Sequence, residues 1–308
     1  MNLDVSAFYP TKKELEKWID SIWQEAHKKK VDTQITDIDG NSDYIGMYHL
    51  GNSCRYIKYE LDNNDVFYAY WQLSMSTPAP LVIHIPGYGA EISRHPEIVA
   101  QGYNVLHIQP LGYNTPKGKD TSKLKYSEHW PVLPDTILTD AKEGYKTWLM
   151  HCVIAIKWAM TQSQSLNNRI SFFGTSQGGG GALLLASLFK GKGVRCAAAD
   201  EPFLTNFPMA NWRGAYNLAK REAYDLVDDK EAAWKSLGYI DTLNHAYRLE
   251  VPVLLTAGGA DETCPHETIE SLYKILPKTK SITYIDGKGH GYTREFLNLV
   301  LAWLRMYA

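Results

Sequence analysis

The stretch that decides the fold is Phe-Phe-Gly-Thr-Ser-Gln-Gly-Gly over residues 172–179. A β-type run over 169–173 leads into it, and a helix-forming run over 182–186 follows. A Gly-x-Ser-x-Gly sequence between a strand and a helix is typical of a sharp turn that lifts the serine hydroxyl above the end of a sheet. Gly174 and Gly178 are expected because the turn strains the serine backbone and leaves no room for a neighbouring Cβ. Ser176 is therefore a candidate nucleophile, and the alternative is a glycine-rich loop with an incidental serine.

Composition and charge exclude several classes of protein. The 308 residues have a net charge of −2, and the only short basic run is at 28–30, so no nucleic-acid partner is expected. No stretch approaches the roughly 18 apolar residues that span a bilayer, and the N-terminus lacks the regions of a signal peptide. Four cysteines without metal-like spacing indicate a reduced, cytoplasmic protein with no metal site.

The N-terminal quarter of the chain predicts a cover helix followed by edge strands. Thr11 and Glu14 form a capping box at the start of a helix over residues 12–30, whose apolar residues share one face. Three β-rich runs follow, separated by turn residues, and are expected to be antiparallel strands. These runs are 44–50, 55–61 and 66–73.

After residue 76 the pattern changes to buried strands alternating with helices, which is typical of a parallel sheet covered on both faces. A long loop-like stretch over 112–140 is expected to line the mouth of a site or a subunit contact. We therefore expect a single α/β domain over 1–308, with the helix and edge strands in 1–75 and a doubly wound catalytic core in 76–308. The predicted strands are 81–85, 104–108, 170–173, 194–199, 253–257 and 281–285, and the predicted helices are 147–160, 265–276 and 294–306.

A nucleophilic serine needs a base and an acid that orients the base. In a doubly wound sheet these groups lie on loops at the carboxyl ends of later strands. Asp261 follows the predicted strand over 253–257, and His290 follows the strand over 281–285, each on a glycine-rich loop. The resulting order of serine, acid and histidine is that of the α/β-hydrolases, with Glu262 and Asp286 as alternatives for the acid.

Other histidines compete with His290 for the role of base. His84 and His107 lie inside predicted buried strands and are expected to be neutral core residues. His245 and His266 fall in helical stretches and are expected at the surface or in packing contacts. Only His290 combines a strand end with a flexible setting.

An oxyanion hole requires two backbone N–H donors. Gln177, the residue after the nucleophile, is expected to supply one. Tyr88, in the Pro-Gly-Tyr-Gly loop that follows the strand over 81–85, is the candidate for the other. This chemistry calls for no cofactor and no metal.

These motifs together resemble the acetyl xylan esterase and cephalosporin C deacetylase family, carbohydrate esterase family 7, whose members have the α/β-hydrolase fold. The similarity is carried by Ser-Gln-Gly-Gly at 176–179, Pro-Phe-Leu at 202–204 and the Cys-Pro pair at 264–265. The resemblance implies a serine esterase that removes acetyl groups from sugars and small alcohols, in a cytoplasmic homo-oligomer, often a hexamer. It implies the same roles for the residues named above: Ser176, Asp261, His290, Tyr88 and Gln177.

The chain departs from the family pattern at two loops. Pro86 stands where the family usually has histidine, and Leu-Gly-Tyr at 111–113 stands where it has Arg-Gly-Gln. These loops shape the mouth and the assembly, so the substrate and the oligomeric state are left open. Two other functions remain: a serine peptidase of the prolyl-oligopeptidase type, and a non-catalytic hydrolase-like protein that binds a ligand.

Overall fold

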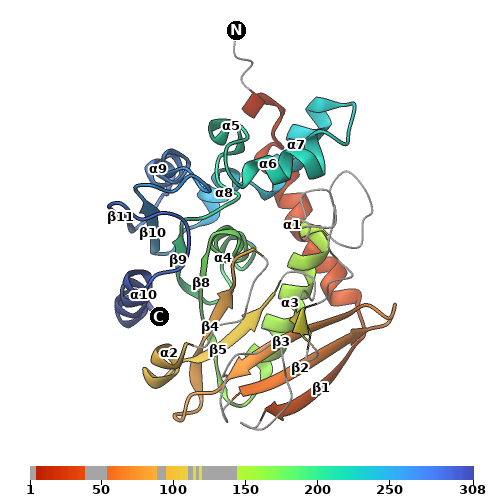
Figure 1. Ribbon diagram of the computed structural model, residues 1–308. Coiled ribbons are helices and arrows are strands. Elements are labelled where there is room, and N and C mark those ends of the chain that lie inside the picture. Colours follow the sequence, from red (N-terminus) through yellow and green to blue (C-terminus); the bar gives the residue numbers. More distant parts are fainter. Residues whose placement is uncertain (1–4, 39–53, 89–94, 110–113, 116–117, 120–143) are drawn as a thin grey trace.

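The computed structural model describes residues 5–38, 54–88, 95–109, 114–115, 118–119 and 144–308 (Figure 1). Within these ranges one sheet runs through the molecule in the order β1-β2-β3-β5-β4-β8-β9-β10-β11. The strands β1, β2 and β3 pair antiparallel, β3 pairs antiparallel with β5, and the remaining pairs are parallel. The strand bounds are β1 Val31–Ile38, β2 Cys54–Leu61, β3 Val66–Gln72, β4 Ala79–Ile85, β5 Asn104–Ile108, β8 Ser165–Thr175, β9 Val194–Asp200, β10 Val253–Gly258 and β11 Lys280–Ile285.

Helices cover both faces of the parallel strands. Alternate residues of each strand face opposite sides, and both faces are apolar, so each face is buried by its own set of helices. Ile83 and Phe172 belong to the larger apolar core with helices α1, α3, α4 and α9, whereas Val82 and Phe173 belong to a smaller core with α2 and α10. The bounds are α1 Lys12–Lys28, α2 Pro96–Ala100, α3 Tyr145–Thr161, α4 Gln177–Leu188, α9 His266–Ile275 and α10 Arg294–Tyr307. The predicted doubly wound arrangement is therefore present.

Helix α1 begins as the sequence predicts. The Glu14 backbone N–H donates to Thr11 Oγ1 at 3.3 Å, and the Thr11 N–H donates to Glu14 Oε2 at 2.8 Å, so both halves of the capping box form. The apolar face, which includes the fully buried Leu15 and Ile22, packs against α3. The helix ends at Lys28, where cations suit its dipole.

A helical segment joins β9 to β10, and in Figure 1 it lies at the top, beyond the carboxyl ends of β4 and β8. A hydrogen bond of 2.8 Å from the Thr242 N–H to the Leu204 carbonyl ties the end of the segment to its start. This segment supplies part of the wall of the site described below. Its elements are α5 Phe207–Ala210, α6 Tyr216–Ala219, the π-helical turn η5 Lys220–Tyr224, α7 Lys230–Ile240, α8 Thr242–His245 and η6 Ala246–Arg248.

Most predicted elements appear with ends shifted by one or two residues, but two strands differ. Strand β1 was not predicted, because Asp32, Gln34 and Thr36 give Val31–Ile38 the polar composition of an exposed edge. Strand β8 begins at Ser165, five residues before the predicted start, because it crosses the polar residues around Asn168. The predicted run over 44–50 lies outside the described residues, and of the loop over 112–140 only the short strands β6 (Asn114–Thr115) and β7 (Gly118–Lys119) are described.

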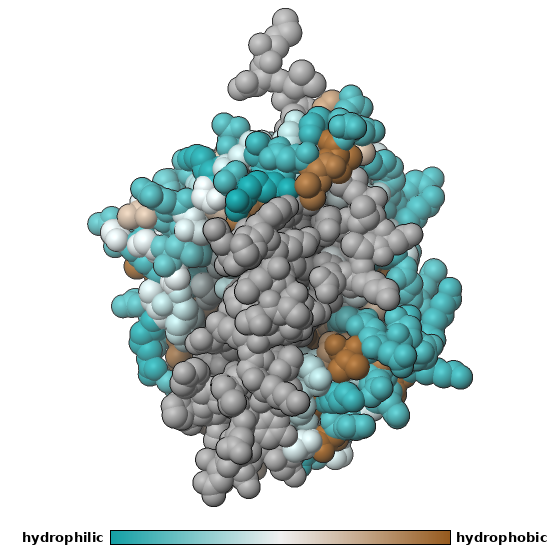
Figure 2. All heavy atoms as spheres, turned by 45° about the vertical axis from the view of Figure 1, so that its right-hand side comes forward, coloured by the Kyte–Doolittle hydropathy of each residue, from teal (hydrophilic) through white to brown (hydrophobic). Residues whose placement is uncertain are grey.

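The described surface is mainly hydrophilic on the face that Figure 2 shows, and its apolar atoms form small separate groups. Large exposed apolar side chains come from distant elements, such as Ile35 of β1, Leu226 and Met306 of α10. In the described ranges, none of the helices is both long enough and apolar enough to cross a lipid bilayer.

Candidate active site

The elbow at the end of β8 has the geometry that the sequence predicts. β8 ends at Thr175, α4 begins at Gln177, and Ser176 between them has φ 57° and ψ −121°, a strained conformation for a residue with a side chain. A Cβ on Gly174 would lie 2.5 Å from the Ile85 carbonyl oxygen, and one on Gly178 would lie 2.5 Å from the Pro86 carbonyl oxygen. The flanking glycines are thus required by close backbone packing.

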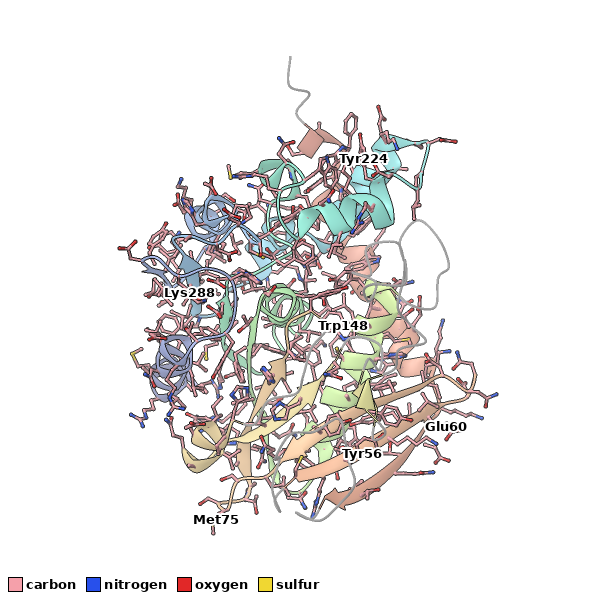
Figure 3. All side chains as sticks on the ribbon, in the orientation of Figure 1. Tyr56, Glu60, Met75, Trp148, Tyr224 and Lys288 are labelled. Carbon is pink, nitrogen blue, oxygen red and sulfur yellow. The ribbon has the colours of Figure 1, made fainter. Side chains whose placement is uncertain are left out.

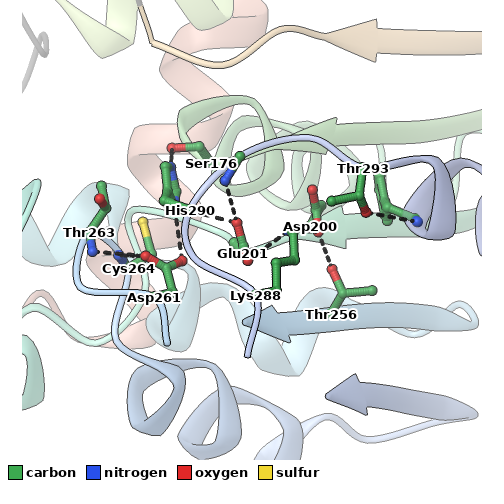
Figure 4. Close-up of polar contacts among 12 residues, drawn as sticks. Ser176, Asp200, Glu201, Thr256, Asp261, Thr263, Cys264, Lys288, His290 and Thr293 are labelled. Carbon is green, nitrogen blue, oxygen red and sulfur yellow. Dashed lines mark hydrogen bonds and ion pairs between the residues drawn. The ribbon is translucent and has the colours of Figure 1, made fainter. Parts of the chain in front are cut away.

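The loops after β10 and β11 bring the predicted acid and base to the elbow (Figure 4). His290 Nε2 lies 2.8 Å from Ser176 Oγ, and His290 Nδ1 lies 2.8 Å from Asp261 Oδ2. With the proton on Nδ1, the ring donates to Asp261 and accepts from the serine hydroxyl. The other candidates for the acid, Glu262 and Asp286, are both exposed.

Asp261 is fixed by its own backbone. Its Oδ1 accepts N–H bonds from Thr263 at 2.8 Å and Cys264 at 2.9 Å, while Oδ2 faces the histidine. The carboxylate is therefore held in one orientation by the loop that carries it, and the histidine has a single tautomer to adopt.

The two predicted oxyanion residues line the same cavity as the serine. Tyr88 and Gln177 both line the cavity that contains Ser176, and a Cβ on the neighbouring Gly87 would lie 3.8 Å from Ser176 Cβ. Gln177 is the first residue of α4, and the first N–H groups of a helix point out of its amino end. Its side chain is turned away, because Gln177 Nε2 donates to the Tyr145 hydroxyl at 2.8 Å. That anchor on α3 was not predicted.

The cavity has a volume of about 390 Å³, within the usual range of small-molecule sites. It is lined mostly by apolar and aromatic groups, with the serine and histidine among them. Phe203, Ala215 and Leu218 come from the segment between β9 and β10, and the sequence pattern assigned none of them to the wall of the site. The lining residues are Gly87, Tyr88, Thr175, Ser176, Gln177, Phe203, Ala215, Leu218, Thr263, His290, Gly291 and Tyr292.

A buried group of charges lies behind the histidine, and sequence reasoning missed it. Glu201, at the end of β9, is fully buried, and its Oε2 lies 3.4 Å from His290 Nδ1. Lys288 Nζ lies 2.7 Å from Glu201 Oε1 and 3.4 Å from Asp200 Oδ1. Burial raises the pKa of both carboxyls, and the contacts with Lys288 act in the opposite direction, favouring the charged forms. The sequence signal that could have indicated this group is the acidic pair Asp200 and Glu201, directly after the predicted strand over 194–199.

The other predicted histidines have structural roles. His84 Nδ1 lies 2.9 Å from His107 Nδ1, and His107 Nε2 lies 2.9 Å from Gln72 Oε1, so these two are hydrogen-bonded inside the core as predicted. Burial lowers the pKa of both well below the usual range, which keeps them neutral. His245 is also buried, between Ser187 Oγ and the Tyr239 carbonyl, each at 2.8 Å.

One group of described residues has side-chain atoms close enough to hold a metal ion: the ligand atoms of Asp261, Cys264 and His290 lie within 4.8 Å of one another. Both ring nitrogens of His290 and both oxygens of Asp261 are already engaged in the contacts above. Burial, followed by the charge of Asp261, raises the pKa of the Cys264 thiol well above its usual value, so the thiolate that metals prefer is disfavoured. The geometry favours a hydrogen-bonded relay over a metal site.

Comparisons with known proteins show what the chain as a whole is similar to. The model of the acetyl xylan esterase (AXE1) family matches residues 1–307. The acetyl esterase Axe7A of Xylanibacter ruminicola is 25% identical over 82% of this chain and 58% of its own length. The uncharacterized peptidase YuxL of Bacillus subtilis is 24% identical over 75% of this chain and 35% of its own. The chain thus spans about a third to three fifths of these two relatives.

A solved structure agrees over the full length. The acetyl xylan esterase from Paenibacillus sp. R4 superposes with a TM-score of 0.78 and 21% identity, covering 100% of both chains. At that identity the likeness concerns the fold, and the predicted α/β-hydrolase fold is confirmed.

Proposed function

The chain belongs to the acetyl xylan esterase family, and from that premise we propose that it hydrolyses short-chain esters, removing acetyl groups from sugars or small acetylated alcohols. The observation that carries the proposal is the unbroken relay from Ser176 Oγ through His290 to Asp261, with both links at 2.8 Å beside a cavity. No metal is needed for this reaction, because the histidine supplies the proton transfers.

In the first half of the reaction, Ser176 Oγ attacks the ester carbonyl carbon while its proton passes to His290 Nε2. Asp261 stabilises the imidazolium that forms, and the backbone N–H groups of Tyr88 and Gln177 stabilise the negative oxygen of the tetrahedral intermediate. The C–O bond to the alcohol then breaks, and His290 returns the proton to the departing alkoxide. The alcohol leaves and an acetyl-serine remains.

In the second half, a water molecule takes the place of the alcohol. His290 accepts a proton from the water as its oxygen bonds to the acyl carbon, and the bond to Ser176 then breaks with return of that proton to Oγ. Acetate leaves, and the enzyme is restored. The amino end of α4 favours the negative charge that develops in both halves.

The cavity supports a small acyl group. Phe203, Ala215 and Leu218 give one part of the wall an apolar character that suits a methyl group. A volume of about 390 Å³ exceeds that of an acetyl group and leaves room for part of the alcohol. Acetylated sugars and acetylated simple alcohols share the acetyl group, so they would differ in the contacts that their alcohol part makes with the cavity.

A fluorophosphonate probe tests the nucleophile without knowledge of the substrate. We expect the probe to label the native protein at Ser176, and Ser176→Ala to lose labelling and at least 10³-fold in hydrolysis of nitrophenyl acetate. Ser163→Ala is the matched control, because that serine is exposed and precedes β8, at the opposite end of the strand from the elbow. Unchanged acetate release by Ser176→Ala would exclude this mechanism.

Two further assays separate the rival functions. A prolyl amide that is cleaved faster than the acetate would favour the peptidase, a possibility to which the similarity to YuxL draws attention. Ligand binding without turnover or labelling would favour the non-catalytic protein.

We also propose a homo-oligomer in a reducing compartment. The family resemblance supports a homo-oligomer, which light scattering of the purified protein would measure. All four cysteines are free thiols in buried positions, which supports a reducing compartment such as the cytoplasm.

A further inference from the structure

We propose that Glu201 is a positioning residue of the relay, a second carboxylate that holds the His290 loop and adds negative charge at the Nδ1 edge of the imidazole. This inference rests on the proposed function, because it assigns Glu201 a part in the proton transfers of His290. It begins from a fully buried acid within 3.4 Å of that ring.

Two contacts fix the Glu201 carboxylate. Its Oε2 accepts the Gly291 backbone N–H at 2.9 Å, and its Oε1 pairs with Lys288 Nζ at 2.7 Å (Figure 4). Gly291 and Lys288 flank His290 in sequence, so the Glu201 side chain, directly after β9, holds the histidine loop on both sides. The backbone N–H of Glu201 donates to the Thr256 carbonyl on β10 at 3.1 Å. The φ of Glu201, 42°, is unusual for a residue with a side chain.

The residues around the Glu201 side chain leave the space that its carboxylate occupies. A Cβ on Gly258, the last residue of β10, would collide with Glu201 Oε1. Lys288, whose side chain is only 8% exposed, extends toward the same point from the loop after β11, as Figure 4 shows. A packing role alone would not explain a buried charge pair, because an apolar pair of similar size avoids the cost of desolvation.

Two carboxylates face the Nδ1 edge of His290. Asp261 accepts the hydrogen bond at 2.8 Å, and Glu201, at 3.4 Å, contributes through its charge. When Ser176 gives up its proton, positive charge arises on the ring between two carboxylates, and Lys288 compensates for only part of their negative charge. The groups that face this site are Ser176 on the elbow, Asp200 at the end of β9 and Glu201 directly after it, Asp261 and Cys264 from the loop after β10, and Lys288 and Tyr292 from the loop after β11.

The first test is the pH dependence of kcat/KM for nitrophenyl acetate in Glu201→Gln. Removal of the charge makes the imidazolium harder to form, so the acid limb should move to lower pH by about half a unit to one unit. Activity at pH 7 should fall about ten-fold, because the transition state loses part of its stabilisation. Glu262→Gln, an exposed acid on the neighbouring loop, is the matched control and should leave the limb in place.

The second test asks whether the two carboxylates act on the same ring. Glu201→Gln should cost a larger factor in Asp261→Asn than in the native protein, because Glu201 is then the remaining carboxylate at Nδ1. Equal factors in both backgrounds together with an unmoved acid limb would overturn the proposal.

Folding and the proposed function are checked separately. If Glu201→Gln does not fold because Lys288 is left with fewer partners, the double variant Glu201→Gln/Lys288→Met removes both charges, and its acid limb should move in the same direction by a smaller amount. An acid limb of kcat/KM that does not move in the double variant would also overturn the proposed role of Glu201. If the probe labels the native protein and does not label Ser176→Ala, the proposed esterase mechanism stands even where the tests contradict the role of Glu201.

Discussion

At the scale of single residues, the elbow depends on atoms that are missing from its glycines. Gly178→Ala would bring a Cβ to 2.5 Å from the Pro86 carbonyl oxygen, and backbone cannot move aside as a flexible side chain can. We expect the free energy of unfolding to fall by about 1–3 kcal/mol or more, measured by urea unfolding. Gly289→Ala is the control, since nothing lies within 4 Å of its Cβ position, and comparable losses in both variants would contradict this explanation.

The same scale shows what the sequence can and cannot reveal about a site. Asp261 and His290 were predictable because each follows an apolar strand on a glycine-rich loop, and parallel strands end at one edge. Glu201 carries the same signal after β9, but a triad needs one acid, so pattern alone gave no reason to consider a second. Its relevance comes from a side chain direction that only the tertiary structure determines.

At the scale of elements, helix α4 lies unusually close to its neighbours because it begins with glycines. A Cβ on Gly181 would lie 2.6 Å from Trp148 Cη2, and Trp148 extends from α3 toward α4 (Figure 3). Gly181→Ala should therefore cost about 1–3 kcal/mol of stability by overpacking. In Trp148→Phe, which lacks the outer ring atoms, the same alanine should cost less, because it occupies space that the indole has left.

A double-mutant cycle with urea unfolding measures this contact. We expect a coupling energy of about 0.5–3 kcal/mol in favour of the double variant. Strict additivity of the two changes would show that α3 and α4 do not meet through Trp148 and Gly181.

The elements also show why some strands are easier to predict than others. Strands β4, β5 and β10 are buried on both faces, and their continuous apolar runs gave bounds within two residues. Among the described residues, strand β1 pairs only with β2, at the edge of the sheet, and Asp32, Gln34 and Thr36 are typical of a solvent-facing segment. Its strand conformation depends on pairing with β2, a long-range interaction that no local pattern encodes.

At the scale of the whole molecule, buried histidines make stability depend on pH. Burial lowers the pKa of His95 and His245 to about 4 and that of His84 and His107 well below the usual range. These groups are neutral in both states at neutral pH, so their effect appears only on acidification. The carboxyls of Glu201 and Asp241, whose pKa burial raises, act in the opposite direction, because the folded state protonates them first as the pH falls.

We expect the free energy of unfolding to fall as the pH drops from about 6.5, the histidine pKa of an unfolded chain, toward 4. In that window the unfolded chain binds protons that the folded core excludes, and each such histidine adds a slope of up to about 1.4 kcal/mol per pH unit. Urea unfolding midpoints between pH 7.5 and 4.5 measure the effect. His95→Phe should reduce the slope, because a phenyl ring keeps the contacts with His84 and Phe173 without a titrating nitrogen. His266→Ala, at a partly exposed position, should leave it unchanged. A stability that stays level from pH 6.5 to 5, together with a slope that His95→Phe leaves unchanged, would contradict this explanation.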